Sequence, residues 1–216
     1  MNDLRPEFEE ANIVVLGSFN PEIFHPEWFV RQGLVREKAA SKVNVVHPEV
    51  SSIEIDNMRF DVNRQRFQAT TNNSECYEPL RDVVIGCFSI LIHGPVRAIG
   101  LNRVFHYKAS SEDAWHHVGN TLAPKQTWDK HLAQPGMRSL TIEGKRKNDS
   151  GGIVQVKVEP SGRTKPGIFI AVNDHYPLEE EKEEQRCSRL IEILKNNWKD
   201  LFRFSEDVSK SILELM

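Results

Sequence analysis

The sequence lacks any long hydrophobic run and carries few cysteines. No stretch of its 216 residues approaches the roughly 18 consecutive apolar residues that a membrane-spanning helix needs. The acidic N-terminus has no apolar core and so does not resemble a signal peptide or a membrane anchor. Cys76, Cys87 and Cys187 are odd in number and far apart, which favours structural thiols in a reducing compartment. We therefore expect a cytoplasmic protein with no membrane partner.

The sequence also lacks an excess of charge of either sign. Lys and Arg total 28 against 31 Asp and Glu, which gives a formal net charge of -3. No global field draws such a chain to nucleic acid or anionic lipid, so binding of that kind must come from a local patch. The sequence contains neither a Gly-x-Ser-x-Gly elbow nor a glycine-rich phosphate loop. These absences favour a non-enzymatic function.

Eight histidines invite a metal hypothesis, but their spacing does not support one. None of them forms the His-x3-His spacing that places two ligands on one side of a helix, and no Cys-x2-Cys pair is present. His116 and His117 are neighbours on a predicted helix, where adjacent side chains point about 100° apart. The sequence therefore predicts no metal site and no cofactor.

A short apolar stretch occurs twice and predicts an internal duplication. Ala98-Ile99-Gly100-Leu101-Asn102-Arg103 echoes Val15-Leu16-Gly17-Ser18-Phe19-Asn20. Each copy is followed by a short helical segment with a tryptophan, several alternating strands and an amphipathic helix. No low-complexity linker separates the copies. We therefore expect one domain over 1–216, built from two pseudo-repeats of approximately 11–95 and 96–216.

Period-2 alternation gives the clearest strand signal between residues 52 and 71. A two-residue turn at Asp56-Asn57 would pair Ile55 with Met58 and Ile53 with Phe60, which places all four apolar side chains on one face. A further strand over 67–71 has the same parity, so the pattern predicts a three-stranded meander.

Helical periodicity follows each group of strands. An apolar stripe over Tyr77–Ile92 predicts a helix on the meander's apolar face, and the region from Leu190 to Phe202 predicts a second, longer helix. Ser205-Glu206-Asp207 has the residues of a fresh N-cap, which predicts a separate short helix at the C-terminus. Asn173, Asp174, His175 and Tyr176 are interpreted as a turn that joins the last strand to the long helix.

These elements predict an α+β fold in which a duplicated β-α-β(3)-α unit forms one curved antiparallel sheet with helices packed on one face. The order of elements resembles the duplicated saddle of TATA-binding-protein-like folds and, secondarily, the helix-grip folds. The opposite sheet face should then display a polar set with four acids and two bases, which disfavours duplex binding across it. Its members are Glu54, Arg59, Asp61, Gln68, Thr70, Thr141, Glu143, Gln155, Lys157 and Glu159.

Three short segments resemble a sporadically distributed family of uncharacterised bacterial proteins. They are Ile99-Gly100-Leu101-Asn102-Arg103, the segment from Ile168 to Tyr176, and Leu201-Phe202-Arg203-Phe204-Ser205. The resemblance covers mainly the second half and carries over no functional residues. Patchy distribution of this kind is compatible with mobile or phage-defence gene neighbourhoods, and so with a multi-component bacterial system.

Basic residues gather at two predicted hairpin tips, and these tips, together with Asp174 and His175, are the candidate binding residues. The tips contain Lys145, Arg146, Lys147, Arg163 and Lys165. Exposed aromatic side chains, such as Trp128 in a segment found only in the second half, would serve as contact anchors.

The first functional hypothesis is a non-enzymatic binding or assembly module whose sheet face and hairpin tips engage a protein partner. The first alternative is a nucleic-acid-binding accessory protein that uses the basic tips. A second alternative is a small enzyme or ligand binder with a site between the sheet and the C-terminal helix, near Asp174 and His175.

Overall fold

The computed structural model describes residues 5–39, 41–146 and 152–216. Its strands form one nine-stranded sheet with the order β2-β3-β4-β5-β1-β6-β9-β8-β7, and every neighbouring pair is antiparallel. The strands are β1 Phe8–Gly17, β2 Ser41–His47, β3 Val50–Ile55, β4 Met58–Asn63, β5 Arg66–Thr71, β6 Val96–Lys108, β7 Leu140–Gly144, β8 Ile153–Pro160 and β9 Gly167–Pro177. The α-helices are α1 Pro26–Arg31, α2 Tyr77–Ile90, α3 Glu112–Leu122 and α4 Arg186–Leu213.

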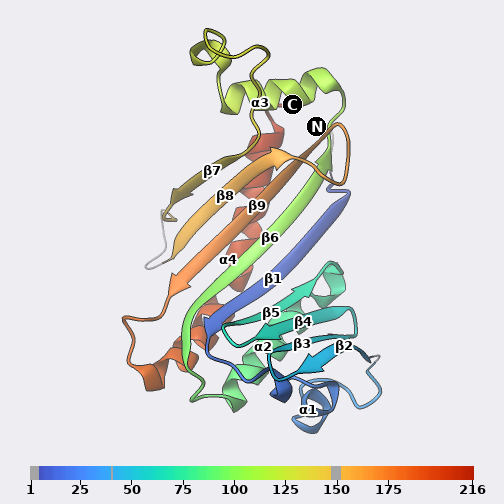
Figure 1. The fold of residues 1–216 in the computed structure, drawn as a ribbon, viewed down its shortest axis with the longest axis vertical. Coiled ribbons are helices and arrows are strands. Elements are labelled where there is room, and N and C mark those ends of the chain that lie inside the picture. The colour runs from blue at the N-terminus through green and yellow to red at the C-terminus, as the bar shows by residue number, and fades with distance from the viewer. Residues whose placement is uncertain (1–4, 40, 147–151) are drawn as a thin grey trace.

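This architecture confirms the predicted α+β fold. The two opening strands, β1 and β6, lie side by side in the middle of the sheet, so both halves of the chain contribute to one β-layer. Figure 1 shows the sheet with α4 running behind it. The internal duplication stays a prediction, since a shared order of elements does not by itself establish a common origin of the two halves.

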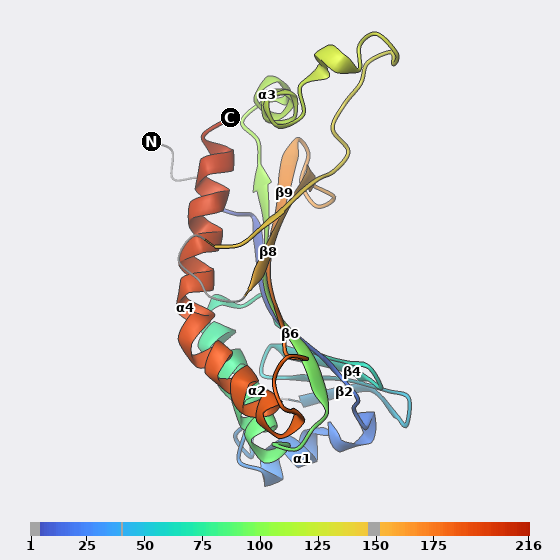
Figure 2. The ribbon, with the colours of Figure 1, turned by 90° about the vertical axis from the view of Figure 1, so that its left-hand side faces the viewer.

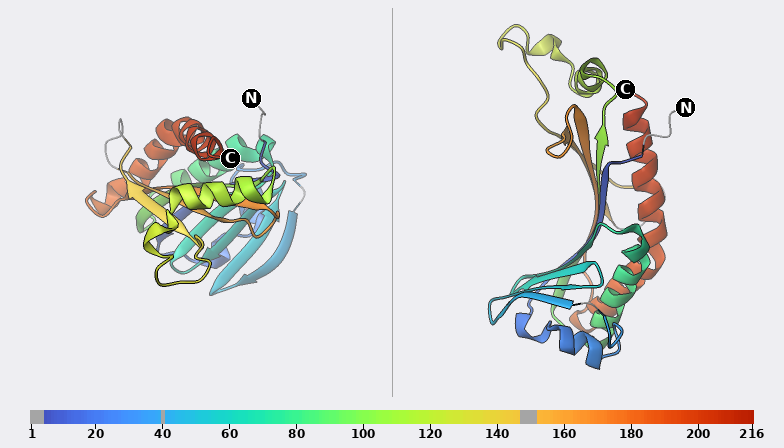
Figure 3. Two further views of the ribbon diagram at one scale, coloured as in Figure 1. Left: turned by 90° about the horizontal axis from the view of Figure 1, so that it is seen from above. Right: turned by 90° about the vertical axis from the view of Figure 1, so that its right-hand side faces the viewer.

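The sheet is strongly curved, and its two faces differ. Figure 2 shows α2 and α4 on the convex side, whereas no helix covers the middle of the other side. The strands β2 to β5 form the lower arm of the resulting crescent, and α3 with the segment that follows it forms the upper arm (Figure 3, right). We call the uncovered side of β1, β5, β6, β8 and β9 the concave face.

The hydrophobic core lies between the sheet and the helices on the convex side. In the lower arm, Phe29, Phe60 and Phe67 pack in a chain of aromatic contacts, with ring centroids 4.8 Å apart between Phe29 and Phe60 and 6.2 Å apart between Phe60 and Phe67. On α4, Leu194 and Trp198 are almost completely buried. The apolar stripes therefore face the sheet, as their helical spacing predicts.

The predicted hairpin at residues 53–60 is confirmed in register. Ile55 pairs with Met58 and Ile53 with Phe60. Asp56 and Asn57 both have positive φ, at 47° and 64°, as a two-residue turn that follows the twist of its strands requires. The parity also confirms the members of the predicted polar set that lie on β3, β4 and β5, because they alternate with buried residues there. Along β7 the alternation with buried residues is not observed, since residues 141–144 are all exposed.

Two strand predictions were wrong. The meander has a fourth strand, β2, at the edge of the sheet, where a bulge between Val43 and Val45 interrupts the alternation that would have marked it. The segment from Asn173 to Tyr176 is not a turn, because it continues β9 and pairs with β6 from Asn102 to Ile99. Pairing along a central strand outweighs the low strand propensity of Asn and Asp.

The predicted break at Ser205 was also wrong, because α4 is one helix from Arg186 to Leu213. The Ser205 hydroxyl donates to the Phe202 carbonyl oxygen over 2.8 Å instead of capping a new helix. A bond of this kind satisfies the hydroxyl of a serine in a helix interior. No helix in the described ranges is long and apolar enough to cross a membrane.

Candidate functional site

Three asparagine side chains lie side by side across the middle of the concave face. Asn12 on β1 pairs with Asn102 on β6, and Asn102 pairs with Asn173 on β9. Asn173 Nδ2 donates to Asn102 Oδ1, and Asn102 Nδ2 donates to Asn12 Oδ1 over 2.7 Å. Asn12 Nδ2 in turn donates to Glu10 Oε1 over 3.2 Å. We call Asn12, Asn102 and Asn173 the amide ladder.

Glu10 sets the direction of the amide ladder. An ionised carboxylate can only accept hydrogen bonds, so Asn12 must turn its N–H group toward Glu10 and its carbonyl toward Asn102. Each of these bonds uses one hydrogen of its amide nitrogen. The second N–H of each amide has no acceptor among the described residues, so the ladder presents a row of donors to whatever lies on the concave face.

A hollow of about 360 Å³ lies directly over the amide ladder. Gly100 lies at the floor of the hollow and, having no side chain, leaves it open. A Cβ at this position would lie 3.6 Å from Asn173 Nδ2 and 3.7 Å from Asn102 Nδ2, which is ordinary van der Waals contact. The glycine is therefore not required by crowding, and any side chain at this position would occupy the hollow. The other lining residues are Asn12, Val14, Leu16, Arg66, Val104, Ala171, Val172 and His175.

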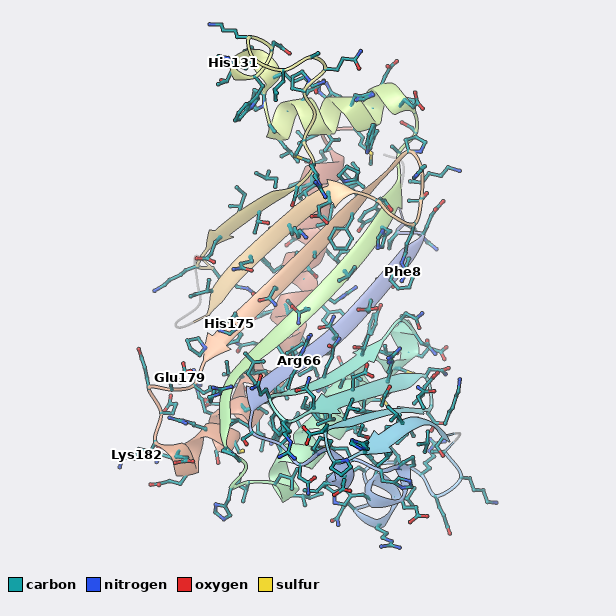
Figure 4. The ribbon with its side chains drawn as sticks, viewed as in Figure 1. Phe8, Arg66, His131, His175, Glu179 and Lys182 are labelled. Atoms are coloured by element: carbon teal, nitrogen blue, oxygen red, sulfur yellow. The ribbon has the colours of Figure 1, made fainter. Side chains whose placement is uncertain are left out.

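Arg66 and His175 stand at opposite sides of this hollow. They belong to β5 and β9, with β1 and β6 between them, so about three strand spacings, or roughly 14 Å, separate their backbones. Figure 4 shows Arg66 near the end of β1 and His175 at the end of β9. No aspartate or glutamate is among the residues that line the hollow.

Most other cations of the concave face and its lower arm are neutralised by a neighbour. Arg59 Nε lies 2.7 Å from Asp61 Oδ2, and Lys157 Nζ lies 2.7 Å from Glu159 Oε1. Arg66 differs, because it forms no ion pair with any residue in the described part of the chain. The hollow therefore carries the one unneutralised guanidinium among the described residues of β4 and β5.

A second cavity of about 420 Å³ lies beneath α3. Its wall contains apolar side chains such as Trp115 and Met137, and the charged groups of Lys125 and Glu159 have opposite signs. The polar groups do not share one chemistry, so this cavity selects no class of ligand despite its larger volume. The hollow over the amide ladder is the better candidate site because most of its unengaged polar groups are donors.

His106 and Ser161 form a pair that resembles a nucleophile and its base. His106 Nδ1 lies 2.8 Å from Ser161 Oγ, but that hydroxyl also accepts from the backbone N–H groups of Arg163 and Thr164, each over 3.1 Å. Ser161 is 5% exposed and His106 is 7% exposed. A buried hydroxyl that ties down its own loop has no free lone pair to attack a substrate, so we assign this pair a structural role.

Asp174 and His175 do not form a common site. Asp174 faces the helices, is fully buried and forms an ion pair with Arg146, whose guanidinium lies 4.6 Å from the Phe204 ring centroid. His175 faces the opposite side and lines the hollow. The continuation of β9 explains this separation, because successive residues of a strand point to opposite faces.

The structure also separates the two basic tips. Lys145 and Arg146 follow β7 and precede β8, whereas Arg163 and Lys165 lie between β8 and β9, so the tips are at opposite ends of β8. Arg163 stacks 3.6 Å from the Phe8 ring centroid. Lys147 lies outside the described residues. Of the predicted site residues, only His175 lines the hollow.

Trp128 is exposed, as a contact anchor for a partner protein would have to be. It is 53% exposed in the upper arm, and Leu132 beside it is 55% exposed. Trp28, by contrast, packs against Phe24 and Phe29. In the described ranges, no group of three or more His, Cys, Asp or Glu residues comes together in a way that could hold a metal ion.

Comparison with known proteins adds no relative to this picture. No protein-family model matches the chain, and no curated protein sequence matches it. The geometry of the concave face is therefore the basis on which a function is proposed.

Proposed function

We propose that the concave face binds a segment of a partner protein and that the chain is a non-enzymatic binding or assembly module. The observation that carries the proposal is the amide ladder, a row of hydrogen-bond donors on the uncovered side of the sheet. Protein backbones and polar side chains offer the acceptors that such a row needs. Trp128 and Leu132 supply an apolar contact on the adjoining arm.

The balance of charge supports a protein partner over a nucleic acid. Phosphate neutralisation needs free cations, but Arg59 and Lys157 are paired with carboxylates on their own strands. Arg146 is engaged by Asp174, and the two basic tips lie at opposite ends of β8. The nucleic-acid alternative therefore has less support than the protein partner.

The enzyme alternative has less support for a different reason. It required Asp174 and His175 to share a cavity between the sheet and α4, and these side chains face opposite sides of the sheet. The resemblance of the second half to sporadically distributed bacterial proteins suggests that the module belongs to a multi-component system such as phage defence. That setting is part of the proposal and follows from no contact in the structure.

Site-specific photo-crosslinking in the source cells tests the proposed face. A photoreactive residue is placed at Thr70 or Lys157 on the concave side and, as a control, at Lys199 on the exposed side of α4. We expect one protein to be crosslinked from both concave positions and not from Lys199. Crosslinks from Lys199 alone, or no crosslink from either concave position, contradict the proposal.

Binding of the purified, identified partner provides a quantitative check. Gln155→Arg adds a bulky charge at the β8 end of the ladder row, and Asn196→Arg adds the same charge on the exposed side of α4. Gln155→Arg should weaken binding at least tenfold, while Asn196→Arg should leave it unchanged. Equal affinity of the two variants would show that the partner binds elsewhere.

A further inference from the structure

From the free N–H donors of the amide ladder, we infer that the hollow receives a carboxylate of the partner, either an acidic side chain or a free C-terminal carboxyl group. This inference deepens the proposed function and rests on it. The chemistry shared by both sources is a planar anion with two acceptor oxygens. Three features favour such a group: the donors that line the hollow, the guanidinium of Arg66, which is unpaired among the described residues, and the volume of the hollow.

Most of the unengaged polar groups that line the hollow are donors. Asn12, Asn102 and Asn173 each keep one free N–H, because an amide nitrogen carries two hydrogens and each of these uses one along the ladder. The carbonyl oxygens of Asn12 and Asn102 already accept from the next amide, whereas Asn173 Oδ1 accepts no hydrogen bond along the ladder. His175 adds an imidazole N–H, and Arg66 adds a guanidinium. A ligand that offers acceptors alone satisfies these donors, whereas an amide or a hydroxyl would bring donors of its own to a hollow with few acceptors.

The positive charge in the hollow favours a negatively charged acceptor over a neutral one. Arg66 has no ion pair within the described ranges, and no carboxylate lines the hollow. A guanidinium and a carboxylate meet through two parallel hydrogen bonds, which are about twice as strong as neutral ones. Glu10, the nearest acid of the ladder, is already bonded to Asn12 and belongs to the row on the far side of the ladder from Gly100.

The dimensions of the hollow suit a side chain and not a larger ligand. Its volume is about 360 Å³, near the lower end of the 300–1,000 Å³ typical of ligand pockets. Val14, Leu16 and Val104 supply apolar contacts for the methylene groups that carry a carboxylate. Phosphate is a weaker match, since its three oxygens usually draw a nest of backbone N–H groups or several cations, and Arg66 is a single cation.

Titration with short peptides tests the inference without knowledge of the partner. The probes are a heptapeptide with blocked ends and one central Glu, the same peptide with Gln, and a Gly/Ser peptide with a free C-terminal carboxyl group. Side-chain amide signals of Asn12, Asn102 and Asn173 are followed by NMR on the full chain. We expect the Glu peptide or the free-carboxyl peptide to shift these signals, which identifies the source, and the Gln peptide to leave them unmoved.

Three variants locate the binding. Arg66→Gln should weaken carboxylate binding at least tenfold, and Gly100→Val should abolish it by filling the hollow. Arg64→Gln is the matched control, because Arg64 is two residues away and its guanidinium is paired with Glu49 at 2.6 Å. Unchanged binding in Arg66→Gln, equal shifts from the Glu and Gln peptides, or stronger shifts from inorganic phosphate or oligo-dT would overturn the inference.

Comparison of Arg66→Gln with the earlier Gln155→Arg variant separates a failure of the inference from a failure of the proposed function. If Gln155→Arg abolishes binding of the crosslinked partner while Arg66→Gln binds it normally, the concave face is an interface but the hollow takes no carboxylate. If the peptides bind in the hollow while no partner crosslinks to the concave face, the carboxylate site stands and the proposed function fails.

Discussion

Arg103 Nη2 donates to Glu9 Oε2 across 2.8 Å, and the arginine side chain is only 1% exposed. Its guanidinium lies among aromatic rings, 3.9 Å from the centroid of Phe202 and 4.9 Å from that of Tyr77. Removal from water lowers the pKa of Arg103. Among the described residues, Nε and Nη1 of Arg103 have no hydrogen-bond partner, so Glu9 is the main compensation for this buried charge.

The first prediction concerns this pair. Glu9→Ala should lower the free energy of unfolding by about 3 kcal/mol, because it leaves an uncompensated cation in the core. Arg103→Met, which keeps much of the packing and removes the charge, should cost less than Glu9→Ala. Urea denaturation measures both, and Glu7→Ala on the same chain end, where the side chain is exposed, serves as the control. A larger loss in Arg103→Met than in Glu9→Ala would contradict this account.

The second prediction concerns the loop between β8 and β9. A Cβ at Gly167 would meet the Thr164 carbonyl oxygen at 2.7 Å and the Tyr107 carbonyl oxygen at 2.8 Å. Both close atoms belong to the backbone and cannot move aside without a large energetic cost, so Gly167→Ala should destabilise the protein by about 2 kcal/mol. A Cβ at Gly144 meets nothing within 4 Å, so Gly144→Ala should change stability by less than about 0.5 kcal/mol. Thermal unfolding of the two variants compares them directly, and similar melting temperatures would be inconsistent with the crowding at Gly167.

The third prediction concerns pH and His106. Burial, followed by the charge of Arg163, lowers the pKa of His106 below its usual value of 6.5. The phenyl rings of Phe8 and Phe169 flank the imidazole, and the Ser161 hydroxyl donates its hydrogen to Nδ1, because Oγ already accepts two N–H groups. The folded state therefore favours the neutral ring.

The sign of the pH effect follows from proton binding. Below pH 6.5 the unfolded chain binds a proton at residue 106 that the folded state resists, so stability is lost as the pH falls from 6.5 toward the lowered folded pKa of His106. The slope for one proton is at most about 1.4 kcal/mol per pH unit. Unfolding free energies of wild type and His106→Gln at several pH values isolate this contribution. A difference between the two that does not change with pH would show that His106 is not responsible.

Much of the fold could be predicted because its signals are local. The turn at Asp56-Asn57 places Glu54 and Arg59 on the open face through alternation alone, and this parity is observed. The strand β9 was predicted to end too early, since Asn173 and Asp174 are poor strand formers in isolation. Had the alternation been continued through them, Asp174 and His175 would have been assigned to opposite faces.

The candidate site could not be predicted because it depends on register between distant strands. The hydrogen bond between Asn12 and Asn102 joins residues 90 positions apart. A shift of one residue between β1 and β6 would turn one asparagine into the core, and no local pattern fixes that register. The signal that was present is modest: Asn12 and Asn102 each interrupt an apolar strand, which calls for a polar partner wherever the strand is buried.

The direction of the amide ladder leads to the last prediction. In Asn102→Asp, the residue still accepts from Asn173, but its second oxygen faces Asn12 Oδ1, so two acceptors meet. Rotation of the Asn12 amide would relieve this contact only by turning its carbonyl toward Glu10, which moves the mismatch one step along the ladder. We therefore expect Asn102→Asp to destabilise the protein by about 1 kcal/mol at neutral pH, because an acceptor on half-buried residue 102 then faces the Asn12 acceptor with no donor between them.

Protonation of the new carboxyl group restores a donor at residue 102, so the deficit should shrink as the pH falls through the range where that group titrates. Asn196→Asp on the exposed side of α4 introduces the same charge without the ladder and should cost little at any pH. Urea denaturation of both variants at neutral and acidic pH measures the difference. If Asn102→Asp were as stable as Asn196→Asp at neutral pH, the three amides would be neighbours on the sheet without a fixed hydrogen-bond direction. The inference that they present a row of free donors to the hollow would then be contradicted.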